Sequence, residues 1–402
     1  MEKVFIVAAK RTPIGAFGGS LKNTSAGNLA AVAIKGALEA AKLTGDKIDE
    51  VIVGNVVSAG QGMGVGRQAA LFAGIPDAVP AYGVNMVCGS GMKTVMDAVS
   101  HIRSGDTEIV VAAGVEVMSQ IPFAAPSSIR DGNKMGNLEL KDLLVADGLT
   151  DVYNQYHMGV TAENVAKEIG LTRQQQDEYA LSSQQKAVAA IEAGKFKDEI
   201  VPVEVKQRRE TVLFDTDEYP KANATMEALS KLRPAFDREG TVTAGNASGI
   251  NDGASAIIVA SESAVKAHGL TPIAEIVSYA QSGLDPKIMG LGPVESVNKA
   301  LAKAELTVND IDVYELNEAF AAQALGVIHQ LAETNQVPVN AIQDKANFNG
   351  GAIALGHPLG ASGNRILVTL VHELHKQNGQ YGVASLCVGG GMGTAVVIKA
   401  VK

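Results

Sequence analysis

A cysteine stands directly before an expected helix in residues 85–91, which read NMVCGSG. The unpaired N–H groups and the dipole at a helix start favour an anion, so we expect this position to stabilise a Cys88 thiolate. Gly89 and Gly91 leave room for a ligand and for close approach of the backbone. The motif fits a nucleophilic cysteine, and taken alone it fits a small buried cysteine under a helix equally well.

A histidine and a second cysteine lie in two other glycine-rich segments. His357 stands between Gly356 and Pro358, before an expected helix, where a lone histidine is usually a polar loop residue. Cys387 ends an expected strand and precedes the run VGGGMG. The backbone N–H groups of such a run suit an oxyanion site, or the run is simply a tight connection between strands. If Cys88 and His357 meet, they form the kind of pair that activates a thiol nucleophile.

An internal repeat supplies the elements that would bring these residues together. Residues 37–44 read ALEAAKLT and residues 300–307 read ALAKAELT, and each copy continues into an Ile-Asp pair and a strand-like segment. A helix and a buried strand follow in both halves, beginning at Gly91 and at Gly363. Two such α/β units, packed about a pseudo-twofold axis, would place the Cys88 and His357 loops at equivalent ends of adjacent sheets.

One long insertion interrupts the first copy. The second half reaches its last strand within a few residues, whereas the matching strand of the first half, 254–259, appears only after a long detour. We therefore expect three parts. They are an N-terminal half (1–118 plus 246–268), an inserted loop domain (119–245) and a C-terminal half (269–402).

Two features of the insertion have local signatures. Thr172 and Gln175 have the spacing of a capping box at the start of a helix. The strand-like run 200–205 precedes a basic stretch at 206–209, which we interpret as the solvated tip of a hairpin.

Composition narrows the function classes. The chain has 402 residues, 46% hydrophobic and 19% charged, which favours large buried α/β cores over disorder. A net charge of −9 argues against a general nucleic-acid surface, and no apolar stretch reaches membrane length. Two cysteines cannot form a disulfide framework, which favours a reducing, cytoplasmic location. The seven histidines are scattered, so we expect no metal and no redox cofactor.

Several motifs together resemble one family. The blocks VCGSG (87–91), NEAF (317–320), GHPLGASG (356–363) and CVGGGMG (387–393) are similar to the signature segments of the thiolases, and GNASGINDGA (245–254) resembles their coenzyme-A segment. The resemblance spans the whole chain, in order. It implies a duplicated thiolase-like fold, with two sheet–helix halves in an α-β-α-β-α core and an inserted loop domain. The segment containing His157 and Met158 is similar to the substrate pocket of the short-chain acetyl-CoA acetyltransferases, where Met158 would keep the acyl pocket short.

The resemblance implies a role for each residue of the reacting centre. Cys88 would attack acetyl-CoA and carry the acetyl group. His357 would take its proton and later polarise the second thioester carbonyl. Cys387 would remove the α-proton of the second acetyl-CoA. Asn317 would hold a water at the enolate, and the N–H groups of Cys88 and Gly389 would bind the oxyanion.

The same resemblance implies a coenzyme-A channel and partners. Ala244 and Ser248 would lie beside the pantetheine arm, Ala319 and Phe320 would line its channel, and Lys221 would approach the nucleotide phosphates. The expected reaction joins two acetyl-CoA into acetoacetyl-CoA and CoA, or reverses that step, in a homotetramer made of two dimers.

Four alternatives remain open at this point. Within the same fold they are a 3-ketoacyl-CoA thiolase of broader chain length, a decarboxylating synthase with two histidines, and a synthase that uses Glu318 as its base. From a different class, the chain could be a non-catalytic acyl-CoA-binding protein. In the expected reaction one site serves both directions.

Overall fold

One ten-stranded sheet runs through the molecule, in a computed structural model that describes residues 2–207 and 210–401. Its strands are β1 (Val4–Arg11), β2 (Gly15–Ala16), β3 (Glu50–Gly54), β4 (Ala81–Val84), β5 (Ile109–Val117), β12 (Asn251–Ser261), β13 (Ala274–Gly283), β14 (Val313–Leu316), β15 (Tyr381–Val388) and β16 (Met392–Ala400). Hydrogen-bonded neighbours follow the order β14–β15–β16–β13–β1–β12–β5–β3–β4, and β2 pairs with β12 beside this path.

The strand order shows the duplication. In the first half β3 pairs with β5 in parallel, and β5, β12 and β1 follow as antiparallel neighbours. In the second half β14 pairs with β15 in parallel, and β15, β16 and β13 follow in the same antiparallel way. The two half-sheets join through β1 and β13, which share only the pairs Phe5↔Glu275 and Ile6↔Ala274. The repeat in the sequence therefore corresponds to two half-sheets that meet at their first strands.

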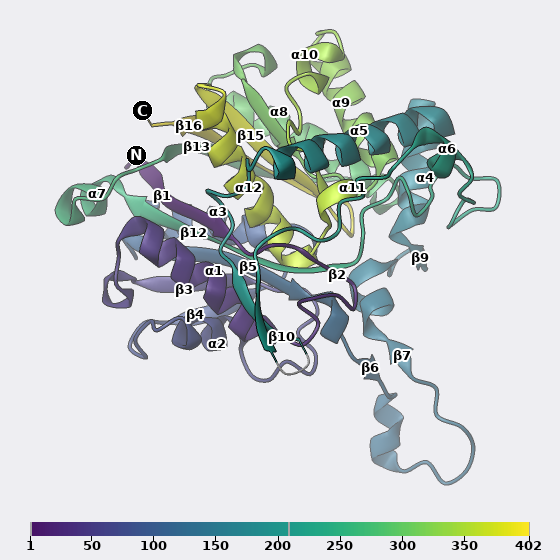
Figure 1. Ribbon diagram of the computed structural model, residues 1–402, viewed down its shortest axis with the longest axis horizontal. Helices are drawn as coiled ribbons and strands as arrows, with labels where there is room; N and C mark the ends of the chain where they lie inside the picture. The colour runs from purple at the N-terminus through teal and green to yellow at the C-terminus, as the bar shows by residue number, and fades with distance from the viewer. Residues whose placement is uncertain (1, 208–209, 402) are drawn as a thin grey trace.

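Helices form three layers around the two half-sheets (Figure 1). They are α1 (Ala26–Ala41), α2 (Val65–Phe72), α3 (Ser90–Ser104), α7 (Glu262–His268), α8 (Gly292–Lys303), α9 (Ala321–Thr334), α10 (Asn340–Gln343), α11 (Ala352–Leu355) and α12 (Leu359–Lys376). α1 and α2 pack on the first half-sheet, and α8 and α9 pack on the second. α3 and α12 pack against each other and contact strands of both halves. The expected α-β-α-β-α layering is confirmed.

The two central helices are placed by their apolar faces. In α3, Val95, Met96, Val99 and Ile102 are fully buried at the helical spacing that the sequence predicts. α3 ends at Gly105, which adopts the left-handed conformation (φ 83°) that a glycine takes without strain. Because α12 is buried on nearly all sides, the residues that start it lie inside the molecule, next to those that start α3.

The insertion between β5 and β12 consists of short strands and of helices, among them the 20-residue α5. They are β6 (Phe123–Ala124), β7 (Lys141–Asp142), β8 (Thr150–Asp151), β9 (Tyr156–His157), α4 (Met158–Ile169), α5 (Arg173–Glu192), β10 (Val203–Gln207), β11 (Glu210–Phe214) and α6 (Met226–Ser230). The capping box of Thr172 and Gln175 at the start of α5 is confirmed, and so is the hairpin, formed by β10 and β11. Residues 208–209 of its basic tip lie outside the described residues.

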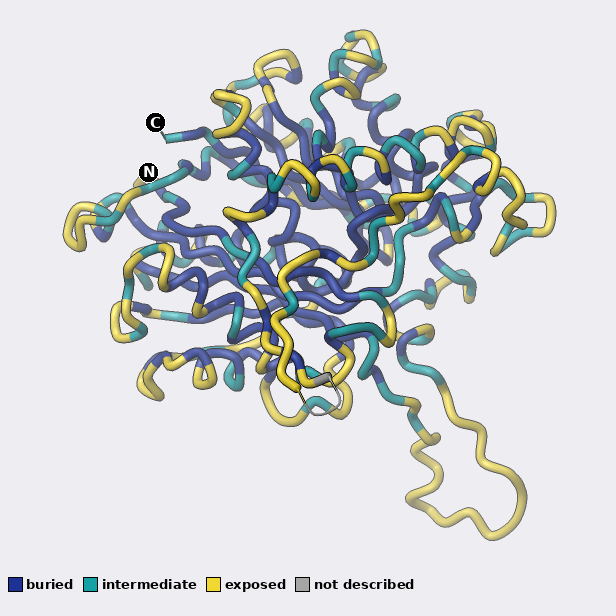
Figure 2. The backbone as a smooth tube through the Cα atoms, viewed as in Figure 1, coloured by how far each residue is buried: buried dark blue, intermediate teal, exposed yellow. Residues whose placement is uncertain are grey.

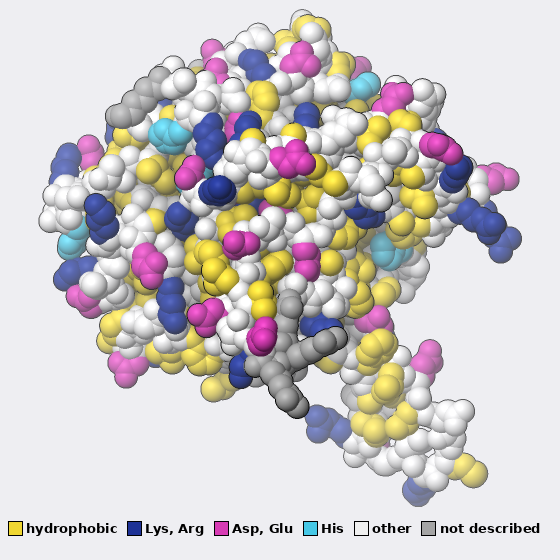
Figure 3. Space-filling model, viewed as in Figure 1, with side chains coloured by type: hydrophobic (Ala, Val, Ile, Leu, Met, Phe, Trp, Pro, Cys, Tyr) yellow, Lys and Arg dark blue, Asp and Glu magenta, His cyan; other side chains and the backbone are white. Residues whose placement is uncertain are grey.

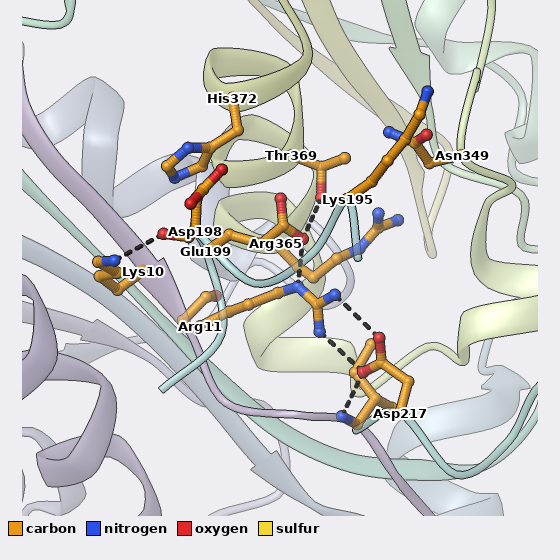
Figure 4. Close-up of polar contacts among 12 residues, drawn as sticks. Lys10, Arg11, Lys195, Asp198, Glu199, Asp217, Asn349, Arg365, Thr369 and His372 are labelled. Carbon is orange, nitrogen blue, oxygen red and sulfur yellow. Dashed lines mark hydrogen bonds and ion pairs between the residues drawn. The ribbon is translucent and has the colours of Figure 1, made fainter. Parts of the chain in front are cut away.

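A buried ion cluster anchors the insertion to β1 (Figure 4). The Arg11 side chain is fully buried and donates to Glu199 (2.6 Å) and to both carboxylate oxygens of Asp217 (2.8 and 2.9 Å). Thr369 of α12 donates to the same Glu199 oxygen (3.1 Å). The cluster thus joins β1, two segments of the insertion and α12.

The segment between β6 and β7 projects from the body, at the lower right of Figures 1 and 2, and most of it is exposed. Among the described residues, no helix combines the length and hydrophobicity needed to cross a membrane.

Candidate active site

Cys88 lies at a strained turn just before α3. Its neighbour Val87 has φ +46°, a left-handed conformation that a β-branched residue rarely adopts. Two local bonds hold the turn: the Asn85 side chain accepts the Val87 N–H (2.9 Å), and the Ser90 hydroxyl donates to the Val87 carbonyl (2.6 Å). Strain of this kind persists only where the surroundings impose it, which is typical of functional sites.

The resting form of Cys88 differs from the sequence expectation. Burial raises the pKa of the Cys88 thiol to about 11, and hydrogen bonding from the N–H groups of Gly389 and of Cys88 itself offsets only part of this rise. The expectation of a thiolate stabilised by the helix start is therefore wrong for the resting protein, because burial outweighs the donors. Cys88 needs a base to remove its proton.

His357 has the tautomer and the protonation state that such a base requires. Its Nδ1 lies 2.6 Å from the Ser362 hydroxyl, which also lies 2.9 Å from the Pro358 carbonyl. Because the carbonyl can only accept, the hydroxyl proton points to it, and Nδ1–H donates to the Ser362 oxygen. This tautomer leaves Nε2 unprotonated, and Nε2 is buried without a partner among the described residues. Burial, aided by the charge of Arg365, lowers the pKa of His357 to about 4, so the imidazole is neutral.

Cys387 and Gly389 come from the other half of the molecule and meet the Cys88 turn. Cys387 is fully buried near the end of β15, and burial, together with the nearby Cys88, raises its pKa well above the usual value. A Cβ placed on Gly89 would lie 2.8 Å from a Val388 methyl group, so the two turns are in close contact. The structure therefore brings Cys88, Cys387 and Gly389 together, with the Gly389 N–H directed at the Cys88 sulfur.

Asn317 follows β14 and is 1% exposed. Its backbone N–H donates to the Ser385 carbonyl (2.9 Å), which places it beside the strand that carries Cys387. Both polar atoms of its side chain lack a partner among the described residues. A buried amide in this state suits a group that binds water or substrate, which agrees with the role that the resemblance implies.

A cavity of about 260 Å³ opens onto His357. Its lining residues are Met118, Leu149, His157, Tyr219, Ala235, Phe236, Ala244, Ala247, Ser248, Gly249, Ile250, Phe320, His357 and Leu359. Four of the residues assigned to coenzyme A and the acyl group are among them. A mostly apolar cavity with few polar groups is the usual form of a site for a small organic ligand.

Two segments far apart in the sequence form one wall of the cavity. The Ser248 N–H donates to the Ala319 carbonyl (2.9 Å), and Ala247 forms a β-bridge with Phe320. Ala319 and Phe320 belong to the same apolar cluster as Met158 and Cys387. Two residues assigned to the channel therefore pack in the same cluster as the second thiol.

His157 has a structural task at this site. Its Nδ1 accepts the Gly159 N–H (3.0 Å) and so caps α4, and its ring stacks on Phe236 at 4.6 Å. Phe236 in turn meets Phe320 edge to face at 6.3 Å. These contacts hold Met158 at the start of α4, and a Cβ on Gly389 would lie 3.6 Å from the Met158 sulfur.

Lys221 is not part of the cavity lining. It is exposed, its backbone N–H donates to Gln184 (2.8 Å), and its ammonium lies 5.6 Å from the centre of the Tyr219 ring. Tyr219 does line the cavity, so Lys221 lies close to its rim. A contact between Lys221 and the nucleotide phosphates stays a prediction.

Glu318 is occupied by structural bonds. Its carboxylate accepts from Ser183 (2.6 Å) and Asn347 (2.9 Å) and is 1% exposed. These bonds join α5 to the loop before α11, so they give Glu318 a packing role. The alternative of a synthase that uses Glu318 as its base is therefore not favoured.

Sequence reasoning missed Ser362, Phe236 and Tyr219. Ser362 lies within the GHPLGASG segment, and its position one helical turn after Pro358 could have suggested a partner for the histidine. Phe236 and Tyr219 lie in the insertion, where no periodic pattern or motif marks them. Only the folded chain places Phe236 against His157 and Tyr219 beside Gly249 in the cavity wall.

With this geometry in place, the chain can be assigned to a family. Residues 4–263 match the family model described as "Thiolase, N-terminal domain", and residues 270–400 match "Thiolase, C-terminal domain". The chain therefore belongs to the thiolase family.

Known relatives resemble it over their full length. It is 54% identical over 400 residues to an acetyl-CoA acetyltransferase of Cupriavidus necator, covering 99% of this chain and 100% of the relative. The crystal structure of the Bacillus anthracis acetyl-CoA acetyltransferase superposes with a TM-score of 0.95 at 44% identity, covering 100% of this chain and 99% of that chain. Human mitochondrial 3-ketoacyl-CoA thiolase in complex with CoA superposes with a TM-score of 0.93 at 46% identity, covering 100% and 98%.

Proposed function

We propose that this protein is an acetyl-CoA C-acetyltransferase, which joins two acetyl-CoA into acetoacetyl-CoA and CoA and catalyses the reverse thiolysis. The observation that carries the proposal is the convergence of Cys88, Cys387 and the Gly389 N–H at one point, beside a cavity that reaches His357. The full-length similarity to acetyl-CoA acetyltransferases supports the choice of substrate.

In the first stage the acetyl group moves to Cys88. His357 Nε2 accepts the thiol proton as the sulfur attacks the thioester carbonyl, because burial leaves Cys88 protonated and His357 neutral. The N–H groups of Cys88 and Gly389 bind the oxyanion, and such a donor typically lowers the barrier by roughly 2.7–4 kcal/mol. The departing CoA thiolate takes the proton of Cys387, which leaves acetyl-Cys88, a Cys387 thiolate and a protonated His357.

In the second stage a carbon–carbon bond forms. The Cys387 thiolate removes the α-proton of a second acetyl-CoA, while protonated His357 and a water held by Asn317 stabilise the enolate oxygen. The carbanion attacks the acetyl carbonyl, and Cys88 leaves and recovers its proton from His357. Protons and charges balance over the cycle, and no electron transfer is involved, so we propose that the reaction needs no metal or redox cofactor.

The test separates the two thiols. Incubation with radiolabelled acetyl-CoA should label the wild-type protein and should leave the Cys88→Ala variant unlabelled. The Cys387→Ala variant should also be labelled, more slowly, because protonated His357 must then supply the proton to the departing CoA. Cys387→Ala should also lose exchange of the α-protons of acetyl-CoA with solvent. Label on Cys88→Ala would refute the assignment, and equal loss of both steps in the two variants would refute the division of roles. A protein that only binds acyl-CoA would show no labelling at all.

The length of the acyl chain that is cleaved distinguishes the proposed enzyme from a thiolase that also accepts longer chains. Met158 packs with Phe320 and Cys387 and lies beside Gly389, so we expect it to limit the acyl pocket. Thiolysis should be at least about tenfold faster with acetoacetyl-CoA than with 3-ketooctanoyl-CoA, and Met158→Ala should narrow the difference. Equal rates for the wild-type protein would favour the broader enzyme.

Two further properties complete the proposal. Both cysteines are free thiols, and the chemistry requires them reduced, which favours a cytoplasmic location. The projecting segment between β6 and β7 exposes large apolar side chains, which supports contacts between dimers in a homotetramer.

A further inference from the structure

A buried carboxylate lies between the two reacting loops and has no part in the chemistry proposed above. Glu116, near the end of β5, is 0% exposed. One of its oxygens accepts the N–H groups of Val56 (2.9 Å) and Gly360 (3.0 Å). The other accepts the N–H of Val57 (3.1 Å) and the side-chain amide of Asn55 (3.2 Å). All four partners are donors, so the site fits a group that only accepts, which is an ionised carboxylate.

One of these bonds reaches the helix that follows His357. Gly360 is in the first turn of α12, where backbone N–H groups have no partner within the helix. Pro358, at the N-cap, makes no side-chain bond to these groups among the described residues. Glu116, from the other half of the molecule, supplies the missing acceptor, and its negative charge suits the helix dipole.

The other bonds lead to the Cys88 turn. The Val56 N–H binds Glu116, and the Val56 carbonyl accepts the Asn85 side-chain amide (2.9 Å). The oxygen of the same amide accepts the N–H of Val87 (2.9 Å), the strained residue directly before Cys88. A continuous chain of hydrogen bonds therefore runs from the first turn of the His357 helix to the nucleophile turn.

The contact between the halves is also tight at this point. A Cβ on Gly360 would lie 2.8 Å from the Glu116 carboxylate and 2.4 Å from the Val115 carbonyl. α12 therefore approaches the end of β5 more closely than any side chain at position 360 would allow. Such a contact leaves little freedom for the His357 helix to shift relative to Cys88.

We infer that Glu116 is a positioning residue, whose carboxylate fixes the start of the His357 helix against the Cys88 turn so that Nε2 can reach the thiol. This inference rests on the proposed function, in which His357 deprotonates Cys88. Small displacements of reacting groups reduce rates steeply. Loss of the Glu116 carboxylate should therefore slow acylation more than it weakens substrate binding.

Glu116→Gln tests the positioning role of the carboxylate, because the glutamine side chain has nearly the same shape. Glu116→Gln keeps one oxygen and replaces the other by an amide group, which faces two N–H donors. Burial raises the pKa of Glu116 to about 7, although the backbone hydrogen bonds that the carboxylate accepts lower it. The glutamine side chain therefore also resembles the protonated form of Glu116. We expect the rate of acetyl-enzyme formation per folded site to fall about 10- to 100-fold, with the KM for acetyl-CoA changed less than about threefold.

A matched control separates positioning from stability. Glu373→Gln changes a carboxylate that is equally buried, at the far end of the same helix, where it accepts the Asn349 amide (2.7 Å). Both variants lower the melting temperature, and only Glu116→Gln should slow acylation. Acylation by Glu116→Gln within about twofold of the wild-type rate, or slowed no more than in Glu373→Gln, overturns the inference.

A second variant tests the hydrogen-bond chain even if Glu116→Gln does not fold. Asn85 is exposed, so Asn85→Ala should fold and should slow acylation about 3- to 10-fold. If one chain connects the two residues, the double variant loses little more than Glu116→Gln alone. If Asn85→Ala is acylated at the wild-type rate, the inference is overturned. It is also overturned if the fold-decrease in the acylation rate of the double variant equals the product of the two single decreases. The wild-type protein in the same assay reports on the proposed function separately, because without acetyl-enzyme in that sample the function itself fails.

Discussion

Burial sets the resting protonation states of the reacting residues. Cys88 is a thiol and His357 a neutral imidazole, since low exposure disfavours the charged form of both. In the proposed reaction the thiol therefore stays unreactive until a substrate carbonyl arrives and His357 takes the proton. This arrangement differs from a preformed thiolate–imidazolium pair, in which the thiolate exists in the free enzyme.

The pH dependence of alkylation distinguishes these two states. Because the pKa of Cys88 is raised to about 11, its thiolate fraction should grow about tenfold per pH unit through the neutral and alkaline range. The rate of Cys88 modification by iodoacetamide should therefore still rise above pH 9. The second-order rate constant can be measured between pH 6 and about 10 by mass spectrometry of the Cys88 peptide. A plateau near pH 7 would show a preformed thiolate and contradict the prediction.

At the scale of elements, the segment between β6 and β7 is unlike the rest of the chain. It extends away from the body, and Figure 3 shows hydrophobic side chains along it. Its exposed large apolar residues are Ile129, Met135, Leu138 and Leu140, and Phe123 of β6 is exposed beside them. Monomeric proteins rarely expose this much apolar surface on an extended segment, so contact with another copy of the chain is expected.

Shortening this segment should change the assembly. Replacing residues 126–139 by a short Gly-Ser linker should convert the proposed tetramer into dimers, because it removes the apolar contact and leaves the half-sheets intact. Light scattering after size exclusion would measure the mass, and Asn133→Asp, within the same segment, serves as the polar control. An unchanged mass in the shortened protein would show that the segment does not join dimers.

Across the whole molecule, one buried ion cluster joins the insertion to the core. Arg11 lies on β1, Glu199 and Asp217 belong to the insertion, and Thr369 lies on α12 (Figure 4). Because Tyr219 lies two residues after Asp217 in the chain, the cluster also helps to place this residue of the cavity wall.

Removing one partner of this cluster should destabilise the protein strongly. Asp217→Ala leaves the Arg11 guanidinium buried and without its two-bond partner, which typically costs about 3–5 kcal/mol. Urea denaturation would measure the change in the free energy of unfolding. Asp215→Ala, an exposed carboxylate two residues away, should change it by less than about 0.5 kcal/mol. Similar values for the two variants would contradict the buried role of Asp217.

Local patterns predicted the parts of the fold that depend on neighbours in sequence. The apolar spacing of α3, the capping box at Thr172 and the hairpin of β10 and β11 all follow from such patterns, and all are present. The repeat of residues 37–44 at 300–307 predicted two halves, and the mirrored strand order confirms them. The protonation state of Cys88 could not be predicted in this way, because burial depends on what the rest of the chain places around the thiol.

The sequence by itself determined which residues could react and that two similar halves would carry them, since residue type, spacing and periodicity are local properties. The tertiary structure decided how those residues meet. It buried Cys88 enough to keep its proton, directed His357 Nε2 inward through Ser362, and placed Phe236 and Tyr219 in the cavity wall. It also set Glu116 of one half against the His357 helix of the other. These contacts join residues far apart in the chain, so their distances and burial exist only after the two halves pack together.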